Sequence, residues 1–119
     1  MIESIAAEQI RGDLASVWVR IYPLVLERLT RIENATAELS KSSPRVETVT
    51  TGREEAHKLA GALGTFGLDR GTQLARALER CLSDPRRSQD VAEAEHLVAN
   101  LRATIERARV GQPGTATHR

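Results

Sequence analysis

The chain has 119 residues, of which 17 are basic and 16 acidic, so its formal net charge at pH 7 is only +1. A charge this close to zero does not favour nucleic acid or an anionic membrane as a partner. The length fits one domain, and 40% hydrophobic residues suffice for a core, which must be aliphatic because only three residues are aromatic.

The sequence gives no sign of a disulfide, a membrane span or a secretory signal. Cys81 is the single cysteine, which excludes a disulfide within the chain and fits a reducing compartment. No apolar run approaches the roughly 20 residues that a membrane-spanning helix needs. The start of the chain lacks a basic segment followed by an apolar one. We therefore expect a cytoplasmic protein.

The first predicted helix runs from about residue 4 to residue 39. Its first apolar face consists of residues at intervals of three and four, namely Ile10, Leu14, Val17, Ile21 and Leu24. The face then slips by one residue and continues as Val25, Leu29, Ile32 and Leu39. Between the two faces, Pro23 lacks an N–H and collides with the carbonyl of Val19. We expect a kink near Pro23, or a break into two helices.

The second predicted helix follows a loop at residues 40–43. Ser43 is the expected N-cap and Pro44 the first helical residue. The inward face is predicted to hold Val46, Val49, Ala56, Leu59, Ala60 and Leu63. The helix should end at Phe66, with Gly67 in the left-handed conformation that terminates many helices.

Two further helices complete the pattern. The third is predicted from Asp69, as its cap, to Leu82, and its inward face holds Leu74, Ala75, Leu78 and Leu82. The fourth runs from about Ser88 to Arg109, and its seam holds Val91, Ala94, Val98, Leu101, Ile105 and Ala108. Short connections between amphipathic helices favour an all-α, antiparallel up-down four-helix bundle over residues 1–110. Residues 111–119 are predicted to be a flexible tail or linker.

His57 is the most informative residue of the second helix. Gly61 and Gly64 follow it at i+4 and i+7 on nearly the same flank, although glycine within a helix costs about 1 kcal/mol relative to alanine. On the helical wheel, His57 falls at the border between core and solvent, together with Arg53, and Lys58 points further toward water. Small residues beside an accessible imidazole indicate a partner that docks there.

The run from Ala56 through His57, Gly61, Gly64 and Gly67, followed by the pair Leu78-Glu79, resembles the histidine phosphotransfer (HPt) domains of bacterial phosphorelays. This resemblance implies a four-helix bundle in which an exposed histidine accepts a phosphoryl group from a receiver aspartate or a kinase and passes it to a receiver aspartate. The partners implied are a response-regulator receiver domain, a sensor histidine kinase, or both.

Carried over to this chain, the resemblance makes His57 the phosphoacceptor and Gly61 the residue that lets the partner come close. Glu79 matches a position that hydrogen-bonds the other ring nitrogen. Many members have a lysine three residues after the histidine, where this chain has Ala60. Arg53, one turn before His57, is the better candidate for stabilising phosphate charge, and Lys58 lies on another face. Docking contacts are expected from Ala62, Thr65 and Leu68.

The chemistry of imidazole agrees with this assignment. Near neutral pH an ordinary histidine is largely uncharged and has one free lone pair for attack on phosphorus. No His, Cys or acidic residues repeat the spacing of a metal site. Mg²⁺ and most catalytic groups are therefore expected on the partner receiver, so this chain needs no cofactor of its own and is a phosphocarrier rather than an enzyme.

Two other interpretations stay open at this point. The chain could be a helical interaction or dimerisation module whose histidine is never phosphorylated. In that case Gly61 and Gly64 would permit close contact between helices. The segment after residue 110 could also join this domain to a receiver or an output domain.

Overall fold

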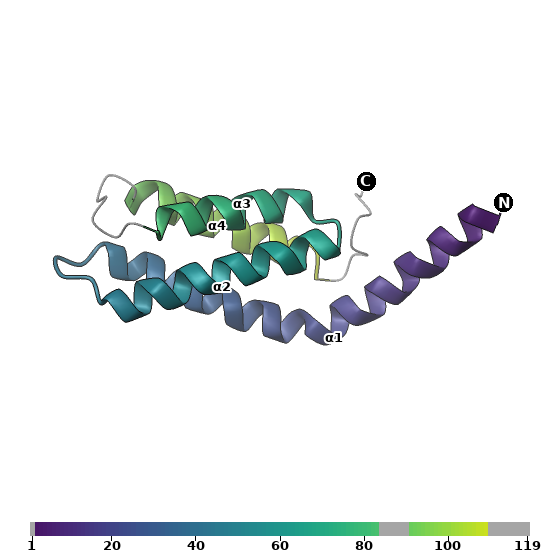
Figure 1. Cartoon of the computed structure of the whole chain (residues 1–119), viewed down its shortest axis with the longest axis horizontal. Helices are drawn as coiled ribbons and strands as arrows, with labels where there is room; N and C mark the ends of the chain where they lie inside the picture. The colour runs from purple at the N-terminus through teal and green to yellow at the C-terminus, as the bar shows by residue number, and fades with distance from the viewer. Residues whose placement is uncertain (1, 84–90, 110–119) are drawn as a thin grey trace.

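The computed structural model describes residues 2–83 and 91–109 of the chain. These residues form four α-helices and no strand: α1 (Ile2–Leu39), α2 (Val46–Thr65), α3 (Asp69–Cys81) and α4 (Val91–Arg107). The helices run alternately up and down the bundle, and the first part of α1 projects beyond it (Figure 1). The predicted all-α four-helix bundle is confirmed.

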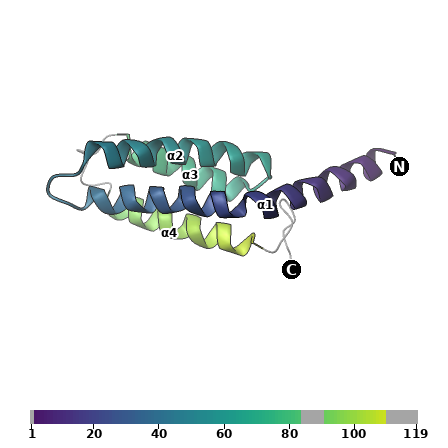
Figure 2. The same ribbon diagram turned by 90° about the horizontal axis from the view of Figure 1, so that it is seen from below.

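The four helices surround one core. Helix α1 packs against α2 and α4, and α3 packs against the same two helices on the other side (Figure 2). The core is largely aliphatic, as the composition predicted, and its fully buried large side chains include Leu29, Ile32, Leu59, Leu63, Leu78, Leu101 and Ile105. Two aromatic rings join it at one end, where Trp18 meets Phe66 edge to face at a centroid distance of 5.2 Å.

Helix α1 is continuous through Pro23. Of the two predicted outcomes, the break into two helices is therefore wrong. Its axis changes direction where it leaves the bundle (Figure 1). Pro23 and Val19 both face solvent, so water can reach the Val19 carbonyl that has lost its helical donor. Leu24 was predicted to face inward but is 44% exposed, because the buried row runs instead from Trp18 to Val25.

The start of α2 differs from the predicted cap. Ser43 does not cap the helix and Pro44 is not its first residue, because Arg45 is the N-cap and Val46 begins the helix. The backbone N–H of Arg45 donates a hydrogen bond of 2.8 Å to Oε2 of Glu38 at the end of α1. A carboxylate from the previous helix thus accepts a backbone N–H at the start of α2, which was expected of the Ser43 hydroxyl. Val46, predicted to be buried, is 65% exposed at this first turn.

The corner between α2 and α3 confirms the predicted left-handed conformation of Gly67. This glycine has φ 74°, which only glycine adopts easily, and its N–H donates to the Gly64 carbonyl. The next N–H, of Leu68, donates to the Leu63 carbonyl, which completes a Schellman motif. Asp69 is not the cap of α3: Leu68 occupies that position, and Asp69 lies in the first turn, where the helix dipole favours a negative charge.

Glycines let the helices around the site approach closely. A Cβ atom at Gly52 of α2 would overlap the Cβ of Ala35 on α1, so these two helices touch backbone to side chain. At Gly71 of α3, a Cβ would lie 2.9 Å from Cδ1 of Leu63 on α2. These contacts fix α2 between its two neighbours and so fix the position of the residues on its outer face.

Helix α4 is held against α1 by hydrogen bonds from two side chains. Arg102 donates to both carboxylate oxygens of Glu33, at 2.6 and 3.0 Å, and these hydrogen bonds raise the pKa of its guanidinium. Just after the last residue of α4, Nε1 of Trp18 donates to the Ala108 carbonyl at 2.8 Å. The predicted start of this helix at Ser88 and the predicted tail at 111–119 lie outside the described residues.

Within the described residues, no helix combines the length and the apolar character that crossing a membrane requires.

Candidate functional site

His57 lies on the outer wall of the bundle, in the middle of α2. Its neighbours Ala56 and Leu59 are fully buried, whereas the His57 side chain is 76% exposed. One step of about 100° around the helix separates His57 from Ala56, which puts the imidazole at the edge of the buried face. The ring is therefore open to an approaching molecule while its backbone is fixed by the core.

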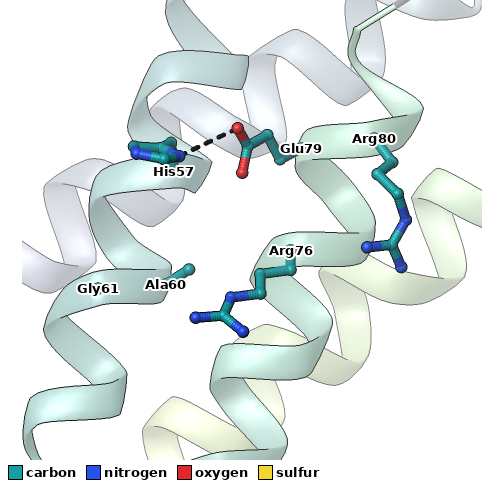
Figure 3. Close-up of a pocket in the computed structure, with 6 residues that line it drawn as sticks. All are labelled: His57, Ala60, Gly61, Arg76, Glu79 and Arg80. Carbon is teal, nitrogen blue, oxygen red and sulfur yellow. Dashed lines mark hydrogen bonds and ion pairs between the residues drawn. The ribbon is translucent and has the colours of Figure 1, made fainter.

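One hydrogen bond orients the imidazole. Its Nδ1 lies 3.1 Å from Oε2 of Glu79, a half-buried residue on α3 (Figure 3). An ionised carboxylate can only accept a hydrogen bond, so Nδ1 is the donor. The neutral ring then has its lone pair on Nε2, which points away from Glu79 in Figure 3.

Gly61 and Gly64 have different surroundings, although both are exposed. A Cβ at Gly61 would meet no atom within 4 Å, so this glycine leaves open space one turn after His57. A Cβ at Gly64 would lie 3.6 Å from Oγ1 of Thr72 on α3, which is ordinary contact. Neither glycine is required for helix–helix contact, and Gly61 leaves the wall beside the imidazole free of side chains.

A hollow of about 500 Å³ opens between α2 and α3 beside the His57–Glu79 pair. Its lining residues are His57, Ala60, Gly61, Arg76, Glu79 and Arg80 (Figure 3). The Arg76 side chain extends from α3 toward α2 and Ala60, whereas the Arg80 side chain extends away from His57. The hollow thus combines a nucleophilic imidazole, a carboxylate and a nearby guanidinium.

A second hollow, of about 520 Å³, lies toward the start of α2. Its lining residues are Arg53, Glu54, His57, Lys58 and Glu79. Arg53 is half-buried there, near the imidazole as the sequence predicted. Lys58 is exposed, and its Nζ lies 3.9 Å from Oε2 of the buried Glu55, which also forms an ion pair with Arg28 of α1. Lys58 therefore interacts on the α1 side of α2.

Of the three predicted docking residues, Ala62 and Thr65 lie on α2 after His57, and Leu68 lies at the α2–α3 corner as the N-cap of α3. Ala62 and Leu68 are half-buried, and Thr65 is exposed with its hydroxyl donating to the Gly61 carbonyl at 3.1 Å. They add a mildly apolar surface to the glycine-lined wall of α2.

Sequence reasoning missed Arg76 and Arg80. Arg76 precedes Glu79 by three residues, and this spacing puts the two side chains on the same face of α3. That signal was available, but the sequence did not give the rotation of α3 against α2, which brings this face to His57. Within the described ranges, 2–83 and 91–109, no group of three His, Cys, Asp or Glu side chains is placed to hold a metal ion.

The sequence of this chain is similar to those of known proteins. Residues 24–111 match the family model of the Hpt domain. The chain is also 32% identical over 89 residues to Protein RcaC of Microchaete diplosiphon. That match covers 75% of this chain but only 14% of RcaC, so the chain spans a small part of this relative's length. A search of solved structures gave no significant match.

The family match includes the whole of α2 and α3, the two helices that hold the exposed imidazole and its carboxylate partner. It also covers α4 and α1 from Leu24 onward, and leaves out the earlier part of α1, which includes the buried Trp18. The chain therefore belongs to the Hpt domain family, whose members carry phosphoryl groups on histidine in phosphorelays.

Proposed function

We propose that His57 is the phosphoacceptor of this domain, taking a phosphoryl group from a receiver aspartate or a sensor kinase and passing it to a receiver aspartate. The observation that carries the proposal is the exposed imidazole with Nδ1 held by Glu79, which leaves Nε2 open to solvent. The open space at Gly61 supports it, because a partner's active site has to come within bonding distance of that nitrogen.

The transfer needs little from this chain beyond a well-placed nucleophile. The Nε2 lone pair attacks the phosphorus of an aspartyl phosphate, the P–N bond forms as the P–O bond breaks, and the aspartate carboxylate leaves with the electron pair. In the return step, a receiver carboxylate oxygen attacks phosphorus and the P–N electron pair returns to Nε2. The Nδ1 proton stays in place, and Glu79 offsets the positive charge of the phosphorylated ring.

The partner supplies the rest of the chemistry in this proposal. Phosphoryl transfer depends mainly on alignment and on neutralising charge, which Mg²⁺ at a receiver's aspartate site provides. The domain then acts as a phosphocarrier rather than as an enzyme. Ala62, Thr65 and Leu68 form its docking surface along α2 and the corner after it, and Arg53 and Lys58 add positive charge nearby.

The test is phosphate labelling from a phosphorylated receiver domain, with variants of two exposed histidines. His57→Gln should abolish labelling, whereas His96→Gln on α4 should be labelled like the wild type. Mass spectrometry at alkaline pH should map an acid-labile phosphate to His57. Equal labelling of His57→Gln would show that the site is elsewhere. Stable binding to receivers and kinases with no phosphohistidine at all would favour an interaction module without phosphorylation.

A further inference from the structure

The charged side chains around His57 differ in whether they already have a partner. Lys58 is within ion-pair distance of Glu55, and Glu79 is occupied by the imidazole. The Arg76 side chain, in contrast, is exposed and, like those of Arg53 and Arg80, forms no hydrogen bond or ion pair with any residue of the described ranges. An arginine that lines a hollow without a carboxylate partner is available to an anion that enters it.

The side of the hollow that faces Arg76 is lined by small residues of α2. Opposite Arg76 on α2 are Ala60, which offers only a methyl group, and Gly61, which offers no side chain. The guanidinium extends toward these two residues in Figure 3. No bulky side chain of the lining residues on α2 therefore separates Arg76 from the space in front of His57.

We propose that Arg76 binds the phosphoryl oxygens when a phosphoryl group is on His57, so that α2 supplies the nucleophile and α3 supplies both the carboxylate and the counter-charge. This proposal rests on His57 being the phosphoacceptor. A phosphoryl group on Nε2 carries up to two negative charges, and the planar guanidinium can donate two parallel hydrogen bonds to its oxygens. Glu79 and Arg76 then act on opposite ends of one phosphoimidazole, the cationic ring and the anionic phosphoryl group.

The pairing of Glu79 with Arg76 also explains the spacing on α3. Glu79 follows Arg76 at i+3, so both project from one face of the helix toward α2. Arg80 lines the same hollow but extends away from His57, so it is not assigned this role. Arg53 approaches the imidazole from the second hollow and is the natural competitor for the phosphoryl oxygens.

The direct test uses the phosphorylated domain alone, so that it does not depend on a cognate receiver. Potassium phosphoramidate transfers its phosphoryl group to exposed histidines, and ammonia leaves. Phosphorus NMR of the wild type, with His57→Gln as the blank, then gives the pKa of the phosphoryl group on His57. Loss of the cation in Arg76→Gln should raise that pKa by about half a unit, because the dianion loses its stabilising partner. Arg76→Lys, which keeps the charge, should restore most of the shift.

Two further variants make the result specific. Arg107→Gln on α4 removes the same charge from the exposed side of another helix and should leave the phosphoryl pKa unchanged. Arg53→Gln tests the competitor. An unchanged pKa in Arg76→Gln, or a shift found only in Arg53→Gln, would overturn the assignment of Arg76. Circular dichroism of each variant checks that the bundle is intact.

The transfer reaction separates this inference from the proposed function. With a phosphorylated receiver as donor, Arg76→Gln should slow labelling of His57 by about tenfold, and Arg76→Lys should recover part of the rate. If the wild type is not labelled on His57 by any receiver or kinase, the proposed function fails. If the wild type is labelled and Arg76→Gln is labelled equally fast, only the role of Arg76 fails.

Discussion

Nδ1 of His57 and Oε2 of Glu79 lie 3.1 Å apart although 22 positions separate the two residues in sequence. The exposed ring on α2 is therefore oriented from α3, and its freedom to rotate depends on how the two helices pack. The Schellman corner at Gly67 and the contact of Gly71 with Leu63 hold that packing.

The first prediction concerns this hydrogen bond. Glu79→Ala should slow phosphoryl transfer to His57 by about tenfold, or about 1.4 kcal/mol in barrier, because the ring loses both its orientation and its counter-charge. Glu79→Gln should fall between the wild type and Glu79→Ala, since the amide oxygen can still accept from Nδ1 but carries no charge. Single-turnover transfer from a phosphorylated receiver measures both. Equal rates for all three proteins would show that Glu79 has no part in the reaction.

The second prediction separates stability from transfer at Gly61. Gly61→Ala should stabilise the domain by about 1 kcal/mol, because alanine favours the helix and the added methyl group meets no atom within 4 Å. The same methyl group should slow transfer, because it stands where a partner's active site must approach. Thermal unfolding and the transfer assay measure the two effects.

Gly12→Ala is the matched control for this experiment. Gly12 is also an exposed helical glycine with nothing within 4 Å of its added Cβ, but it lies on α1 away from His57. It should stabilise the helix without changing the transfer rate. A Gly61→Ala protein that transfers at the wild-type rate would mean that no partner comes close to this wall.

The third prediction concerns the contact between α1 and α2. Gly52→Ala should destabilise the bundle by about 1–3 kcal/mol, because the new Cβ overlaps that of Ala35 and neither backbone can move away without disturbing the core. Urea unfolding at constant pH measures the change. The opposite signs expected at Gly52 and Gly61, two glycines of one helix, make this pair informative. A stabilised Gly52→Ala would show that α1 and α2 have room to separate.

The fourth prediction is a pH dependence of folding stability. The backbone N–H of Arg45 and the Lys41 ammonium hydrogen-bond the Glu38 carboxylate and lower its pKa below the ordinary value of 4.5. A carboxyl whose pKa is lowered on folding stabilises the folded state above its unfolded pKa. That stability is lost as the pH falls through the folded pKa. The contribution of Glu38 should therefore be complete above pH 4.5 and disappear below it.

Comparison with Glu38→Gln isolates this effect. The variant should have a lower Tm than the wild type at pH 7, and the difference should shrink as the pH is lowered below 4.5. Thermal unfolding at a series of pH values measures it. A difference that stays constant across this range would indicate that the side chain acts through packing and not through its charge.

Local chemistry was enough to predict much of the fold. The buried rows of α2 and α3, including Leu59, Leu63 and Leu78, follow directly from helical periodicity, and Gly67 is recognisable as a terminator because few other residues adopt its φ. The starts of the helices were harder to predict from the sequence. Ser43 has the residue type of a cap, but the carboxylate that accepts from the Arg45 N–H belongs to Glu38, seven residues before Arg45 and on another helix.

The same distinction applies to the candidate site. His57, Gly61 and Glu79 follow a pattern that can be read along the chain, and the structure puts the imidazole and the carboxylate together. Arg76 could not be recognised in this way, because its proximity to His57 depends on the rotation of α3 against α2. The need for glycine at position 52 could not be recognised for a similar reason, because it depends on the contact with Ala35 of another helix.

The hydrogen bond from Trp18 to Ala108 has a practical consequence. It fastens the end of α4 to α1 at the pole of the bundle from which the first part of α1 projects (Figure 1). The histidine stands on the flank instead. A fluorophore or an immobilisation tag attached through α1 would leave that flank clear. The molecule can thus be immobilised at one end of the bundle while partner proteins bind to and dissociate from its flank.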